Sequence, residues 1–153
     1  MESITEAEAR KFLEESVVIH FGVIAEGEPY VTPMSFVVDG ERLLFRTKAG
    51  RRLTAIQADP VVSLEVSDFQ PDTGDWMSVI LRGRVAEVTD EETMQKTHDL
   101  LFEKYEAAMG PLLSRGEEAA LPTTPHVFEV SIDEISGRVS ATGFSFRTRP
   151  GRF

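Results

Sequence analysis

Six segments of the chain have the apolar content and the length of β-strands, and clusters of turn-forming residues separate them. They are residues 16–25, 30–38, 42–47, 61–69, 76–89 and 126–139. The pair Asp39-Gly40 stands between two apolar runs, which is a strong local signal for a β-hairpin. Pro33 has no N–H to donate, so we expect its strand at a sheet edge or with a bulge.

Three further segments have helical spacing. Thr5 with Glu8 forms a capping-box pattern, and the helix after it is anchored by Phe12 and Leu13. A second short helix is expected in "RRLTAIQADP", where Asp59-Pro60 stops it. A third is expected over 90–106, capped by Thr89 with Glu92. Its apolar face consists of Met94, Thr97, Leu101, Tyr105 and Ala108.

The order of these elements predicts a mainly β (α+β) fold. The strands follow one another with short helices between them and do not alternate as βαβ units. We therefore expect a six-stranded antiparallel split β-barrel with a few short flanking helices. Neither an internal repeat nor a linker is evident, so residues 1–153 form a single domain. Residues 140–153 show no period and are expected to be a tail or a partner-contacting arm.

Composition narrows the classes of function. The chain has 26 acidic and 16 basic residues, a formal net charge of −10, which disfavours nucleic acid or an anionic membrane as a partner. No signal-peptide pattern or spanning apolar run is evident, so a cytoplasmic protein is expected. The chain has no cysteine, and its three histidines lack metal-ligand spacing, so no metal site is expected.

One segment opposes this acidic balance. "FRTKAGRRL", residues 45–53, carries Arg46, Lys48, Arg51 and Arg52 and no acid. It has the order of a strand, a glycine turn and a helix start, where free backbone N–H groups favour an anion. Cations in a first helical turn oppose the helix dipole unless an anion offsets them. Either the segment binds a phosphate, or its cations pair with surface carboxylates; the spacing alone favours neither.

The basic segment and its flanks together resemble a known family. "LLFRT", the glycine turn and "RRLTAI" are similar to the phosphate-binding segment of flavin-binding split-barrel proteins, the pyridoxamine 5′-phosphate oxidase-like family. The resemblance extends upstream through "GVIAEGEPYVTPMSFVVDGERLLFRT" and downstream through "VVSLEVSDFQPDTGDWMSVILRGRV". "DEISGRV" is similar to the family's closing strand.

This resemblance implies a homodimer with FMN at its interface. By position, Arg46, Thr47, Arg51 and Arg52 hold the FMN phosphate, with Lys48 as a further candidate. The strand at 31–35, with Thr32 and Pro33, runs beside the isoalloxazine ring. Ser78 takes the place of a polar residue that contacts the flavin, and Trp76 borders the pocket.

The resemblance also implies a function, with alternatives. The chain lacks the family's Arg-rich substrate-binding segment at its C-terminal end, so pyridoxine phosphate is not expected as the substrate. An FMN-dependent oxidoreductase acting on a small molecule is the first hypothesis, and no catalytic side chain is assigned. The second is a reductase that uses deazaflavin F420, with Arg147, Arg149 and Arg152 available for its glutamyl tail. The third is a non-catalytic flavin-binding or interaction protein.

Overall fold

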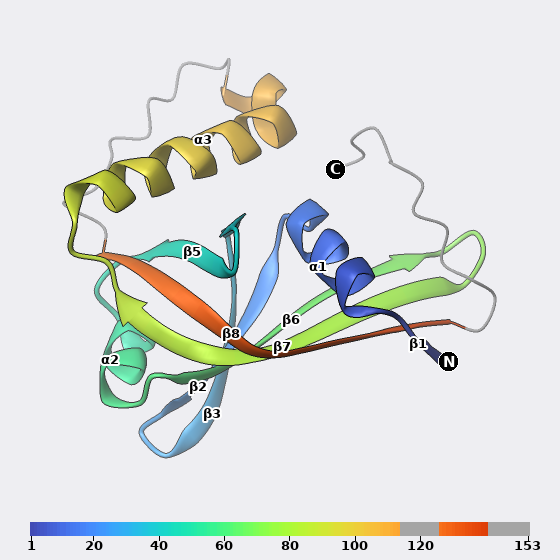
Figure 1. Cartoon of the computed structure of the whole chain (residues 1–153), viewed down its shortest axis with the longest axis horizontal. Helices are drawn as coiled ribbons and strands as arrows, with labels where there is room; N and C mark the ends of the chain where they lie inside the picture. Colours follow the sequence, from blue (N-terminus) through green and yellow to red (C-terminus); the bar gives the residue numbers. More distant parts are fainter. Residues whose placement is uncertain (114–125, 141–153) are drawn as a thin grey trace.

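The computed structural model describes residues 1–113 and 126–140, and the side chains of 107–113 are left aside. Within these residues, eight strands and three helices follow one another along the chain (Figure 1). The strands are β1 (Glu2–Ser3), β2 (Ile19–Ala25), β3 (Glu28–Met34), β4 (Val37–Asp39), β5 (Arg42–Thr47), β6 (Val61–Gln70), β7 (Asp75–Glu87) and β8 (His126–Val139). The helices are α1 (Glu6–Glu15), α2 (Arg51–Ala58) and α3 (Glu91–Leu113).

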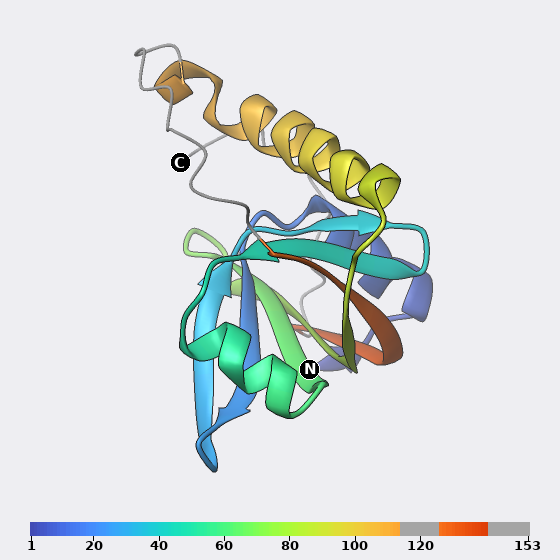
Figure 2. The same ribbon diagram turned by 90° about the vertical axis from the view of Figure 1, so that its left-hand side faces the viewer.

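The strands form one antiparallel, strongly curved sheet. Its order is β3-β2-β6-β7-β8-β5-β4, and β1 pairs with β8 outside this path. The sheet curls into a split barrel, with β3 and β4 at its two ends (Figure 2). The predicted fold class is therefore confirmed, and Pro33 lies on an edge strand as expected.

The predicted strand count of six is too low for two reasons. The segment 30–38 was expected to be a single strand but is divided into β3 and β4 by Ser35 and Phe36. Tyr105 explains the break, because its hydroxyl bonds both the N–H and the carbonyl of Phe36 in place of a sheet neighbour. The other addition is β1, two residues that gain strand geometry by pairing with β8.

Tight turns join the hairpins where the sequence indicates them. Glu26 and Gly27 form the two-residue loop between β2 and β3, and both have positive φ, as a type I′ turn requires. Gly40, also at positive φ, follows Asp39 in the β4–β5 turn. The Asp39-Gly40 hairpin is therefore confirmed.

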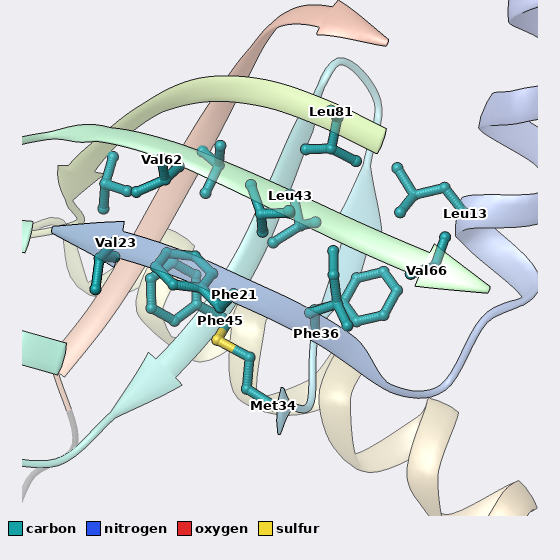
Figure 3. Close-up of a cluster of buried hydrophobic side chains, with 14 of the residues drawn as sticks. Leu13, Phe21, Val23, Met34, Phe36, Leu43, Phe45, Val62, Val66 and Leu81 are labelled. Atoms are coloured by element: carbon teal, nitrogen blue, oxygen red, sulfur yellow. The ribbon is translucent and has the colours of Figure 1, made fainter. Parts of the chain in front are cut away.

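The core fills the inside of the barrel (Figure 3). Alternate residues of each strand point inward, as Met77, Val79 and Leu81 do on β7. The rings of Phe21 and Phe45 lie 5.0 Å apart between their centroids, on strands from opposite parts of the sheet order. These contacts hold β2 and β5 in place, and α2 follows β5.

A second, smaller cluster seats α3 on the outer side of β4 and β5 (Figure 2). Leu101 of α3 packs there against the buried Val37, Leu44, Val88 and Val127, and the predicted apolar face is confirmed for Met94, Thr97, Leu101 and Tyr105. The Ala108 side chain lies outside the described residues.

The cap of α3 differs from the prediction. Asp90, and not Thr89, accepts the hydrogen bond from the N–H of Thr93. In the part of the chain that the structure describes, none of the helices is long and apolar enough to cross a membrane.

Candidate functional site

The basic segment closes one end of the barrel, where β5 turns into α2. Arg51 and Arg52 are the first two residues of α2, which packs on β2. No side chain caps the start of this helix, and its first turn has no acidic residue. The space next to Gly50 is open, since a Cβ built there has no described atom within 4 Å. The first N–H groups of α2 thus have no side-chain acceptor among the described residues and lie at an open surface.

Arg52 connects α2 to β3 across the split of the barrel. Its Nε donates a hydrogen bond of 2.9 Å to the hydroxyl oxygen of Thr32. Burial lowers the pKa of the guanidinium, and a smaller opposite effect comes from Tyr30. Within residues 1–113 and 126–140, no carboxylate forms an ion pair with Arg52. A half-buried cation without a counter-charge is unfavourable in a finished structure, and it suits an anion that arrives from outside.

Arg51 lies over the ring of Tyr30, with 4.7 Å between its guanidinium carbon and the ring centroid. Tyr30 belongs to β3 and points to the same side of the strand as Thr32. The nearest carboxylate is that of Glu26, at 4.0 Å and on an exposed side chain. The aromatic face thus positions a guanidinium whose own ion pair is weak.

Thr47 and Lys48 complete the turn. Thr47 is buried at the end of β5, and its hydroxyl donates to the carbonyl of Lys48 at 3.3 Å. The Lys48 side chain is exposed. Lys48 therefore adds positive charge beside the cluster, and its side chain forms no ion pair with a described residue.

Arg46 departs from the other cations. Thr47 points into the barrel, whereas Arg46 lies on the opposite face of β5, toward α3. There its Nη1 lies 2.9 Å from Nδ1 of His98. The structure thus brings Arg51, Arg52, Thr32 and Tyr30 together and places Arg46 on the opposite face of β5.

The alternative to phosphate binding is that the cations of the basic segment pair with surface carboxylates. Of its four cations, Arg51 is the only one that reaches a described carboxylate, and the distance is at the limit of an ion pair. Neutralisation by surface carboxylates therefore does not explain the segment within the described residues.

The side chains of Pro33, Ser78 and Trp76 point away from this cluster within the single chain. All three are on the outer face of the sheet, since Pro33 pairs with His20, and Ser78 and Trp76 alternate with buried residues of β7. Through the sheet register, Thr32 of the cluster aligns with Phe21, Leu64 and then Leu81 on β7. Ser78 and Trp76 thus lie three strands away from Thr32, and three and five residues along β7 from Leu81.

The Ser78 hydroxyl already has a partner. It donates to Glu65 at 3.2 Å, and the other oxygen of Glu65 contacts Nδ1 of His20 at 2.9 Å. These three residues lie on adjacent strands of the outer face. A polar network therefore lies at the position where the resemblance expects a flavin contact.

Sequence reasoning missed Tyr30, His98 and Glu65. Tyr30 alternates with Thr32 on an edge strand beside the expected site, and this spacing was a usable signal. His98 and Glu65 gave no such signal, because they meet Arg46 and His20 over separations of 52 and 45 residues. The predicted arm falls on residues outside those described, except Ser140, whose hydroxyl bonds Asp75 at the start of β7.

Comparison with solved structures finds the same architecture in several bacterial proteins. An FAD-binding protein from Mesorhizobium loti superposes with a TM-score of 0.73 at 23% identity, covering 92% of this chain and 98% of the other. An FAD-binding protein from Mycobacterium smegmatis superposes with a TM-score of 0.65 at 22% identity, covering 91% of this chain and 99% of the other. A flavocytochrome from Azotobacter vinelandii superposes with a TM-score of 0.68 at 22% identity, covering 90% of this chain and 69% of the other. At these identities the likeness concerns the fold.

Sequence comparison gives a closer assignment. An uncharacterised protein of Rhizobium meliloti is 26% identical over 123 residues, which cover 77% of this chain and 81% of the relative. Residues 5–139 match the sequence profile of the pyridoxamine 5′-phosphate oxidase family. That match spans every helix, β2–β8 and the whole basic segment. The chain therefore belongs to the pyridoxamine 5′-phosphate oxidase family.

Proposed function

We propose that this chain is a flavin-binding protein that holds the phosphate of FMN at the start of α2 and acts as an oxidoreductase on a small molecule. The observation that carries the proposal is Arg52, a half-buried guanidinium bonded to Thr32 with no described carboxylate partner. Arg51 and the uncapped N–H groups of α2 add donors on the same side. Together they have the charge and the hydrogen-bonding capacity that a phosphate monoester needs.

Family membership and the structural neighbours support a flavin as the ligand. Two of the neighbours are described as FAD-binding and a third as a flavocytochrome. They favour the flavin class rather than FMN in particular. We choose FMN because the donors at α2 form one compact cluster, which suits a single phosphate group.

The side chains have separable tasks in this proposal. Arg51 and Arg52 bind the phosphate, and Tyr30 and Thr32 fix the two guanidinium groups before the ligand arrives. The edge of β3 that faces away from β2 offers backbone groups to a planar ring. A bound flavin would supply hydride or single-electron transfer, so no side chain needs to act as an acid or a base.

The test is the identity of the cofactor that copurifies with the protein. We expect the absorption bands of an oxidised flavin and, after denaturation, a released molecule with the mass of FMN. Release of FAD would correct the cofactor, and release of F420 would support the second hypothesis. A preparation that contains no flavin and binds no added FMN would overturn the proposal. Turnover with NAD(P)H and an added acceptor distinguishes an enzyme from a non-catalytic flavin carrier.

We also propose that the protein is a homodimer, joined through the outer face of β2, β3, β6 and β7. Large apolar side chains are exposed there, among them Val31 (63%), Phe69 (59%) and Ile80 (51%). Such patches commonly mark interfaces. A second copy is the occupant we favour because Ser78 and Trp76 lie three strands from Thr32 and on the opposite face of the sheet, so a partner is needed to bring both groups to one ligand.

A further inference from the structure

Arg46 and His98 form a contact that the proposed function does not use. Arg46 is on β5, His98 is on α3, and 2.9 Å separates Nη1 of the arginine from Nδ1 of the histidine. A guanidinium has donors only, so Nδ1 must be the acceptor. The imidazole in this contact is therefore neutral and carries its proton on Nε2.

Among the residues that the structure describes, Arg46 forms no ion pair with a carboxylate. The charged neighbours that affect His98 are Arg46 itself and Asp99 of α3, which act in opposite directions on its pKa. On β4, Asp39 is occupied by Lys96 and Arg42. On β8, His126 is paired with Glu87. His98 is thus the described group that holds the Arg46 guanidinium.

We propose that His98 is a positioning residue for Arg46, holding the guanidinium by one nitrogen so that its remaining N–H groups are available to a phosphate at the start of α2. This inference rests on the proposed function. Arg46 lies four residues before Gly50, the N-cap of α2, at the end of β5 and on the face of that strand that packs against α3. One nitrogen is bound to His98, and four N–H groups remain. Binding an anion to a guanidinium that is already ordered costs less side-chain entropy.

The contact also predicts how pH acts on the site. A protonated His98 has no lone pair for Arg46 and carries a second positive charge against it. Burial, followed by the charge of Arg46, lowers the pKa of His98, so the contact forms above that lowered pKa. The advantage that Arg46 gives to phosphate binding is expected to be present above this pKa and to be lost as the pH falls through it.

The experiment compares His98→Leu, which removes the acceptor, with His98→Asn, whose amide oxygen restores an acceptor that does not titrate. Dissociation constants are measured for FMN and for riboflavin, which lacks the phosphate. For His98→Leu we expect FMN binding to weaken about tenfold and riboflavin binding to stay unchanged. His98→Asn should retain most of the wild-type FMN affinity, with apo-protein thermal unfolding as the check on folding.

A pH series isolates the titration of His98. The second proton of a phosphate monoester also titrates, near pH ~6, and it does so equally in both proteins. The wild type should therefore lose FMN affinity more steeply than His98→Asn as the pH falls. Without any flavin, the ring resonances of His98 should titrate at a higher pH in Arg46→Met than in the wild type, because a neighbouring cation is gone.

The outcomes separate this inference from the proposed function. If the wild type prefers FMN to riboflavin and His98→Leu keeps the full preference, the positioning role is overturned and the phosphate site stands. If His98→Asn is as weak as His98→Leu, the acceptor is not what matters, and the role is again overturned. If the wild type binds FMN and riboflavin equally, the proposed phosphate site is overturned, and so is this inference.

Discussion

At the scale of single residues, two guanidinium groups are positioned before any ligand binds. Thr32 and Tyr30 fix Arg52 and Arg51 from an edge strand, and the nearest described carboxylate lies at 4.0 Å from one of them. Arrangements of this kind usually mark function, because neither contact neutralises the charge. Each side chain therefore has a measurable consequence when it is removed.

Arg51→Ala with Arg52→Ala is expected to weaken FMN binding at least a hundredfold. Each charge-assisted contact is worth about 1.5–3 kcal/mol, and about 1.4 kcal/mol corresponds to a factor of ten. Stability of the apo-protein should hold or rise slightly, because cations in a first helical turn oppose the helix dipole. Isothermal titration with FMN checks the prediction. Riboflavin is the control, and a double variant that still binds FMN tightly would contradict it.

At the scale of elements, α3 is attached by a few specific contacts. Tyr105 donates to the carbonyl of Val17 at 2.6 Å and accepts from the N–H of Phe36 at 3.0 Å. Lys104 points its amine at the ring of Phe36, 3.8 Å from the centroid, and this buried nitrogen has no hydrogen-bond partner among the described residues. The Tyr105 hydroxyl therefore stabilises the packing of α3 on the barrel, whereas burial of the Lys104 amine destabilises it.

Tyr105→Phe is expected to lower the free energy of unfolding by about 1–3 kcal/mol, because it leaves a buried backbone N–H and a carbonyl without partners. Chemical denaturation of the apo-protein measures this. Tyr30→Phe is the matched control, since the ring that lies beneath Arg51 is retained and stability should change little. Equal effects of the two changes would mean that the Tyr105 hydroxyl does not hold α3.

Lys104→Met is expected to raise stability by about 1–2 kcal/mol near neutral pH, a discounted figure because the side chain is only partly buried. Burial lowers the pKa of Lys104 from 10.5 to about 8. Between these values the unfolded chain binds more protons than the folded one, so wild-type stability should gain a contribution as the pH rises through this window. Denaturation at about pH 7 and about pH 10 checks the sign.

The Lys104→Met variant should lack this gain in stability at high pH. Lys96→Met is the contrasting control, because Lys96 bonds Asp39 at 3.0 Å and its removal should destabilise the protein instead. If wild type and Lys104→Met share one pH profile, the amine is solvated and the prediction fails.

How far the sequence predicts these elements depends on whether their causes are local. The capping box of α1, the Asp39-Gly40 turn and the full length of β8 follow from neighbouring residues, and all were predicted correctly. The break at Phe36 was not, because it depends on a hydroxyl 69 residues away. The position of Arg46 was missed for the same reason, since its partner is on another element.

At the scale of the whole molecule, the outer sheet face determines the oligomeric state that we propose. Ile80 lies on β7, the border strand of that face, between Glu65 on β6 and Ser136 on β8. Half of its surface is exposed although it stands in the middle of a sheet. Exposing such a side chain costs little free energy in a monomer, and burying it contributes strongly to the free energy of dimerisation.

Ile80→Lys is expected to give a monomer of about 17 kDa, where the wild type is a dimer, because burying an unpaired ammonium in an interface is costly. Light scattering at micromolar concentration measures the mass. Phe102→Lys is the control, as Phe102 is equally apolar and 62% exposed but lies on α3, away from this face. A wild-type protein that is already monomeric would overturn the homodimer.

The position of β8 in the sheet has a consequence for how the protein folds during its synthesis. This strand is the last one described in the chain, yet it lies between β7 and β5 and also pairs with β1. While a ribosome synthesises the chain, β5 and β7 have no neighbour on those sides until residue 139 has emerged. The barrel then closes in a late step in which β8 pairs with β7, β5 and β1. Until that moment two unpaired strand edges stay exposed in the nascent chain, so its yield in a cell is expected to depend on how fast β8 is synthesised and docks.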